Sequence, residues 1–215
     1  RYGSAHRVRL PRGFEPAGIT RGVVVGGVPS GNSYLVVLVD AASGAVRGIL
    51  GTGFTLAIGH GLVVWAYGCY ASIDQPCTLH STAVAGGESA TFRLPRPPGS
   101  SGGILSPDGG RIAFTMERAA QDTRFGQGHP IPPTDIAILD LRTGRLEIVP
   151  GIELPAKSAT GLAFSPDGRW LVIALDAGTR TRLLAWRSGL AHPYETAPIR
   201  GPAAYGPPVM VVTGS

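Results

Sequence analysis

Short apolar runs separated by turn residues recur along this chain. Residues 103–114 read GILSPDGGRIAF and residues 161–172 read GLAFSPDGRWLV, with the Ser-Pro-Asp-Gly tetrapeptide repeated 59 residues later. Proline presets φ at the first central position of a turn, aspartate bonds nearby N–H groups, and glycine accepts positive φ. The pattern predicts two equivalent β-hairpins. The residues at their tips are Asp108, Gly109, Asp167 and Gly168.

A second marker sets the period of the repeat. DAASG at 40–44 matches DLRTG at 140–144, 100 residues further on. Each copy follows a run rich in β-branched residues and precedes another short strand-like run. Two units of about 50 residues fit this spacing, which lies in the range of β-propeller blades.

These anchors predict an all-β fold, a β-propeller with four recognisable four-stranded antiparallel blades in a single domain over 1–215. Such units cannot bury both faces alone and must stack on neighbours. A two-sheet sandwich is the alternative, although it does not require the same turn order in successive units. The predicted blades cover 14–53, 54–98, 99–155 and 156–201. The predicted strands are 17–20, 23–25, 34–40, 45–50, 55–58, 62–67, 78–84, 90–94, 103–105, 111–116, 135–141, 145–149, 161–164, 170–175, 182–187 and 194–199.

Two further strands are predicted near the ends of the chain. Residues 7–10 have the pattern of a last blade strand, and residues 209–212 that of a first one. Either these two strands close the ring, or the natural protein contains further blades. We favour further blades upstream, and we interpret the chain, which starts at Arg1 rather than Met, as a trimmed or processed piece of a longer protein. No run approaches the ~18 apolar residues of a transmembrane helix, and no signal peptide is recognisable.

The charge pattern argues against a nucleic-acid partner. The formal net charge is +5, from 19 Lys+Arg against 14 Asp+Glu, and Lys157 is the single lysine. The arginines are scattered singly rather than clustered with stacking aromatics, as a nucleic-acid binder would require. We interpret them as solubilising surface charge.

The two cysteines favour a disulfide. Cys69 and Cys77 flank the connection between the second and third strands of the second blade, where cross-strand neighbours approach bonding distance. A disulfide there indicates an oxidising compartment; a metal pair or free thiols are the alternatives. No CxxC pair is present, and no histidine has HExxH or HxH spacing. We expect no metal and no other cofactor.

No catalytic motif stands out. The glycine-rich segments 51–53 and 100–103 open no predicted helix, so neither reads as a phosphate loop, and no GxSxG elbow is present. We therefore predict no catalytic residue and favour a protein that is not an enzyme. Glycan chemistry by paired loop acids is the alternative. Its candidate acids are Asp74, Glu117, Asp122 and Glu153.

Loop length singles out one face of the predicted propeller. The connections between second and third strands span 26–33, 68–76 and 117–134, and they differ more than the other turns. Long loops on a rigid scaffold usually carry function. The longest connection, 117–134, also has the composition of a disordered surface segment. The candidate ligand residues on this face are Tyr70, Asp74, Arg118, Arg124 and His129.

The repeat resembles TolB-type and WD-repeat-like propellers, through its Ser-Pro-Asp-Gly hairpins and the DLRTG strand end over 100–190. VVWAYGC at 63–69 and CTLH at 77–80 make the chain similar to extracytoplasmic propeller regions of actinobacterial membrane-anchored proteins of unknown function. That resemblance implies a cell-surface or secreted module, anchored in the full-length protein by an upstream helix. It brings no catalytic residues with it.

The leading hypothesis is a non-catalytic extracytoplasmic propeller that binds a protein or cell-wall ligand through the long-loop face. A propeller enzyme acting on glycans, as hydrolase or lyase, is the alternative, and a structural spacer is a third. Propeller repeats specify a scaffold, and a scaffold does not specify function.

Overall fold

The chain folds into antiparallel sheets. The computed structural model describes residues 7–69, 77–117, 134–152, 154, 160–176, 180–196 and 199–200. Over these ranges every regular element is a strand. Within the same ranges, no helix has the length and hydropathy needed to cross a membrane.

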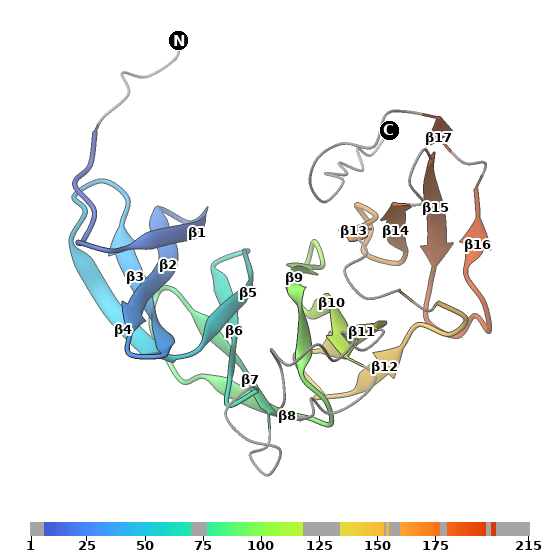
Figure 1. The fold of residues 1–215 in the computed structure, drawn as a ribbon, viewed down its shortest axis with the longest axis horizontal. Helices are drawn as coiled ribbons and strands as arrows, with labels where there is room; N and C mark the ends of the chain where they lie inside the picture. The colour runs from blue at the N-terminus through green and yellow to red at the C-terminus, as the bar shows by residue number, and fades with distance from the viewer. Residues whose placement is uncertain are drawn as a thin grey trace. The chain divides into compact units, whose positions relative to one another are not determined.

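Four sheets follow one another along the chain, each built from strands that pair in chain order (Figure 1). Sheet 1 contains β1 (Glu15–Thr20), β2 (Val23–Ser30), β3 (Ser33–Asp40) and β4 (Val46–Thr52). Sheet 2 contains β5 (Phe54–Gly59), β6 (Leu62–Tyr67), β7 (Cys77–Ala83) and β8 (Ala90–Leu94). Sheet 3 contains β9 (Pro98–Leu105), β10 (Arg111–Glu117), β11 (Thr134–Asp140) and β12 (Leu146–Ile148). Sheet 4 contains β13 (Thr160–Phe164), β14 (Leu171–Asp176), β15 (Arg180–Trp186) and β16 (Tyr194–Glu195), and β17 (Ile199–Arg200) also pairs with β15.

The predicted hairpin tips are confirmed. In both Ser-Pro-Asp-Gly turns the glycine N–H donates to the serine carbonyl oxygen at 2.8 Å, from Gly109 to Ser106 and from Gly168 to Ser165. Their φ angles of 68° and 69° lie in the left-handed region that only glycine adopts at little cost.

Several predicted boundaries are wrong, and one of them is the start of the strand predicted at 103–105, because β9 begins at Pro98. The predicted loop 26–33 is strand, because β2 and β3 continue to a two-residue turn at Gly31–Asn32. A Cβ on Gly26 would lie 2.6 Å from the ring of Phe14, so the glycine permits close packing within a strand instead of marking a loop. Residues 7–10 form no strand; they pass close to Gly44, where an added Cβ would clash with the Arg9 carbonyl oxygen. The last predicted strand of sheet 4 is two short ones, β16 and β17. The predicted strand 209–212 lies outside the described residues.

The chain divides into two compact units. Unit 1 comprises residues 1–68 and 78–93, and unit 2 comprises residues 69–77 and 94–215. Sheets 1 and 2 therefore belong to unit 1, and sheets 3 and 4 to unit 2, apart from a few residues at the ends of β7 and β8.

Unit 1 is held together by an apolar core shared by its two sheets. The buried core residues are Val23, Val25, Val36, Leu38, Val63, Trp65 and Val84. At the turn end of the core, the Gly61 N–H donates to the buried Thr20 hydroxyl at 2.9 Å. This hydrogen bond ties the hairpin tip of sheet 2 to sheet 1.

Unit 2 repeats the arrangement with a larger core. Its buried residues are Ala113, Ile136, Ile138, Val149, Ile152, Leu154, Phe164, Leu171, Ile173, Leu184 and Trp186. At the turn end of this core, an arginine side chain joins the two sheets: the Arg111 guanidinium of sheet 3 donates to the carbonyl oxygen of Gly168 at the hairpin tip of sheet 4. The same guanidinium carbon lies 5.5 Å from the centroid of the Phe164 ring, within range of a cation–π interaction.

The core assignment predicts unequal effects for one substitution at two sites. Ile173→Ala removes a side chain with no exposure from the unit 2 core and should lower the free energy of unfolding by about 2–5 kcal/mol. Ile49→Ala, at a residue that is 60% exposed, should change it by about 0.5 kcal/mol or less. Urea unfolding followed by tryptophan fluorescence measures both. Equal destabilisation by the two variants would contradict this core.

Candidate functional site

The predicted ligand residues lie outside the part of the chain that the structure describes. Tyr70, Asp74, Arg118, Arg124 and His129 fall within residues 70–76 and 118–133. The strand ends that carry these two connections are described. They are the β6–β7 end, at Tyr67 and Thr78, and the β10–β11 end, where Glu117 pairs with Thr134.

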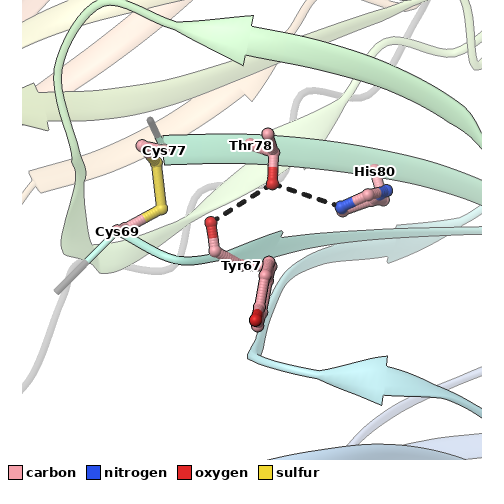
Figure 2. The surroundings of a disulfide bond; sticks show 5 residues. All are labelled: Tyr67, Cys69, Cys77, Thr78 and His80. Atoms are coloured by element: carbon pink, nitrogen blue, oxygen red, sulfur yellow. Dashed lines mark hydrogen bonds between the residues drawn. A yellow bond between two sulfur atoms is a disulfide. The ribbon is translucent and has the colours of Figure 1, made fainter. Parts of the chain in front are cut away.

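The predicted disulfide is present in the structure. Cys69 and Cys77 are bonded and buried, with their Cα atoms 4.2 Å apart (Figure 2). Cys77 is the first residue of β7 and Cys69 follows β6. The bond closes the connection 70–76 where it leaves the sheet. We call Tyr67, Cys69, Cys77, Thr78 and His80 the stapled end of sheet 2.

Polar groups at the stapled end form a chain of hydrogen bonds. The Thr78 hydroxyl donates to the Tyr67 carbonyl oxygen at 3.3 Å and lies 3.3 Å from His80 Nε2 (Figure 2). The Thr91 hydroxyl lies 3.1 Å from His80 Nδ1. Because the Thr78 hydroxyl already donates to a carbonyl, it accepts from Nε2–H, and Nδ1 accepts from Thr91. The Tyr67 side chain remains 49% exposed.

His80 is the neutral histidine of the stapled end. Its imidazole stacks on Trp65 with ring centroids 4.3 Å apart. Burial lowers the pKa of His80 below its ordinary value of 6.5, because desolvation disfavours the charged imidazolium. The neutral imidazole holds Thr78 and Thr91 in position at neutral pH.

The acids at the turn end of the strands serve the backbone. Hydrogen bonds from Ser43, Arg47 and Ala42 hold the pKa of Asp40 far below its ordinary value of 3.8. The pKa of Asp108 is lowered by the Ser106 hydroxyl and the Gly110 N–H, and that of Asp167 by the Ser165 hydroxyl and the Arg169 N–H. The pKa of Asp140 is lowered chiefly by the Thr143 N–H. Asp108 and Asp167 are turn components, as the Ser-Pro-Asp-Gly pattern predicts, and Asp40 and Asp140 accept backbone N–H groups of their own turns in the same way.

The acids that an enzyme would need are mostly outside the described residues. Asp74, Asp122 and Glu153 belong there. Glu117 is buried at the end of β10. No group of three His, Cys, Asp or Glu residues able to hold a metal ion occurs among the residues with described positions.

Sequence reasoning missed a cavity between sheets 3 and 4. It has a volume of about 150 Å³ and lies at the end of the strands that carries the turns. Its lining residues are Arg111, Ile138, Asp140, Arg145, Glu147, Trp186 and Ser188. One signal was available in the repeat: the residue seven positions after the marker aspartate is Arg47 in sheet 1 and Glu147 in sheet 3.

Comparisons with known proteins show the fold. No protein-family model matches the chain, and no curated protein matches its sequence. Among solved structures, Pyrococcus horikoshii acylaminoacyl peptidase matches with a TM-score of 0.57 and 10% identity, over 85% of this chain and 32% of the peptidase. The β-propeller domain of Myceliophteria thermophila Cps50 (Swd1) matches at 0.55 and 14%, over 81% and 51%. An oligogalacturonate lyase in complex with manganese matches at 0.53 and 13%, over 88% and 55%.

These likenesses and the four successive antiparallel sheets, each with four strands paired in chain order, confirm a β-propeller fold. TolB structures from Agrobacterium tumefaciens and Acinetobacter baumannii also match, with TM-scores of 0.49 and 0.37. The chain spans between 32% and 55% of the length of the three structures described above. The actinobacterial and membrane-anchored parts of the sequence resemblance stay predictions.

The disulfide predicts a measurable stabilisation. Unfolding the unreduced protein should expose no free thiol to titration. Replacing both cysteines by serine should lower the free energy of unfolding by about 2–3 kcal/mol, the chain-entropy value for so short a loop. Thr78→Ser, which keeps the neighbouring hydroxyl and the disulfide, is the control. Two titratable thiols in the unreduced protein would contradict the bond.

The turn acids predict a loss of stability in acid. Their folded-state pKa values lie below the ordinary 3.8 of the unfolded chain, so their contribution is complete above about pH 4 and is lost as the pH falls further. Asp40→Asn should therefore destabilise the protein near neutral pH and flatten the decline below about pH 4. Urea midpoints measured between about pH 6 and pH 2.5 test this, with Glu88→Gln, at an exposed residue, as the charge control. A variant profile parallel to that of the parent protein would refute the assignment.

Proposed function

We propose that this chain is a non-catalytic β-propeller module that acts outside the cytoplasm and binds a cell-wall glycan through the stapled end of sheet 2. The observation that carries the proposal is the disulfide between Cys69 and Cys77. Disulfides persist in oxidising compartments and are rare in the cytosol. The bond also lies at the base of connection 70–76, one of the loops in which the sequence predicts ligand residues.

The chemistry around the staple supports a hydroxyl-rich ligand. Tyr67 presents a half-exposed aromatic side chain at the end of β6, and an aromatic ring offers a rigid apolar face with a polar tip. The backbone beneath it is held by the Thr78 hydroxyl and by the adjacent disulfide. A binding residue fixed in this way loses little conformational entropy when a ligand arrives.

The ionisable groups favour binding over turnover. His80 is neutral, and each ring nitrogen has a threonine hydroxyl partner. Asp40, Asp108 and Asp167 are engaged in turns at the other end of their strands. The alternative, a hydrolase or lyase acting on glycans, requires two acids that converge in one site.

Replacing Tyr67 tests the proposal. Tyr67→Ala should weaken co-sedimentation of the protein with insoluble peptidoglycan by about tenfold or more, the effect of losing one aromatic anchor. Tyr194→Ala, on β16 of unit 2 and 59% exposed, is the matched control and should bind as the parent protein does. Equal binding by the two variants would exclude Tyr67 from the site.

The connection 118–133 can be tested separately, because Glu117 and Thr134 are direct partners in the β10–β11 ladder. An Asn-Gly turn can replace the connection without changing the register. Lost binding would assign ligand contacts to the deleted residues. Release of soluble sugars from the glycan would support the enzyme alternative. Capture of a cell-surface protein in the absence of glycan would show that the ligand is a protein. Unchanged binding by both the loop and the Tyr67 variants would favour the spacer hypothesis.

A further inference from the structure

The cavity between sheets 3 and 4 is large enough for a planar side-chain head group. Its volume of about 150 Å³ is close to that of an engineered cavity that admits benzene. Sheet 3 contributes Asp140 and Glu147 to its wall, sheet 4 contributes Trp186, and the turn after β15 contributes Ser188. The indole N–H of Trp186 donates to the Leu190 carbonyl oxygen at 3.1 Å, so this wall is fixed.

Each of the two carboxylates uses one oxygen for the fold. Asp140 Oδ1 accepts the N–H groups of Arg142 and Thr143, at 2.9 and 2.8 Å. Glu147 Oε2 accepts the Ser188 hydroxyl at 2.8 Å. Within the part of the chain that the structure describes, the assigned hydrogen bonds to these carboxylates go to Asp140 Oδ1 and Glu147 Oε2, and the Thr143 hydroxyl also bonds to the Asp140 carboxylate. The cavity therefore has acceptor capacity left over on two acids.

The arginines of the cavity leave that capacity unused. Arg111 is held by the Gly168 carbonyl oxygen and by the face of Phe164. Arg145 is exposed, and within the described ranges it makes no ion pair. The first arginine is a fixed part of the wall, and the second is a solvated residue of the rim.

In sheet 1, the position equivalent to Glu147 is occupied by an arginine, Arg47. There the guanidinium of Arg47 donates through Nε, at 3.0 Å, and through Nη2 to Asp40 Oδ2. The ladders align Val46 with Leu146, since each pairs with the residue before the marker aspartate. The next residue in sheet 3 is Glu147. A second carboxylate therefore replaces the internal guanidinium.

We propose that this cavity binds the guanidinium group of an arginine side chain presented by a partner polypeptide. A planar guanidinium donates several hydrogen bonds in a fixed fork that matches carboxylate oxygens. Asp140 and Glu147 supply the acceptors, and Ile138 and Trp186 supply an apolar wall. This site is separate from the stapled end and does not depend on the function proposed above.

The binding test uses N-acetyl-arginine amide as the probe and the indole N–H resonances of the protein as the readout. The chain has three tryptophans, so the Trp186 signal can be assigned by substitution of the other two. The probe should shift the Trp186 resonance with saturation, and the citrulline analogue, which has the same shape without the charge, should not. No shift with the arginine probe, or an equal shift with citrulline, would overturn the proposal.

Three variants separate a cation site from an anion site. Glu147→Arg supplies the guanidinium internally, as in sheet 1, and should weaken probe binding by at least about tenfold. Glu147→Gln, a smaller change, should weaken binding in the same direction and serves if the arginine variant misfolds. Arg145→Ala removes a competing cation and should strengthen probe binding. Undiminished binding by both Glu147 variants would overturn the proposal, as would binding of inorganic phosphate that Arg145→Ala abolishes.

Discussion

The burial of one sheet face against the next is the interaction on which the rest of this structure depends. A four-stranded antiparallel sheet with apolar residues on both faces cannot bury them alone. In sheet 1, Val36 and Leu38 pack toward sheet 2, and the alternate residues Val37 and Val39 are buried as well. The hairpin tips are tied across the same interfaces, by Thr20 in unit 1 and by Arg111 in unit 2.

This packing divides the chemistry of the molecule between the two ends of its strands. At the turn end, aspartates such as Asp108 and Asp167 are engaged by backbone N–H and hydroxyl groups, and their low pKa values follow from those bonds. At the stapled end, turn geometry does not require an exposed tyrosine, a disulfide or a stacked histidine. Side chains that the fold does not need are the ones available for recognition.

Repetition also makes departures from the repeat informative. Equivalent positions in sheets 1 and 3 share a strand register and a turn, so a difference in charge between them has no local explanation. Asp40 accepts hydrogen bonds from Arg47, whereas Asp140 and Glu147 both line a cavity from the side of sheet 3. The scaffold tolerates this exchange because the turn itself depends on Oδ1, which the same backbone N–H groups hold in both sheets.

The strand order, the hairpin tips and the cysteine pair could be predicted from the amino-acid sequence, because strand alternation, turn chemistry and the spacing of two cysteines across one hairpin are properties of residues that are near each other in the chain. Prediction from the sequence failed where distant residues decide the outcome. Gly26 reads as a loop residue until the ring of Phe14 is seen to occupy the space of its missing side chain. The segment 7–10 reads as a strand, yet it passes Gly44 without pairing as one. The cavity beside Glu147 exists only because two sheets meet there, and no local pattern encodes the gap that their side chains leave.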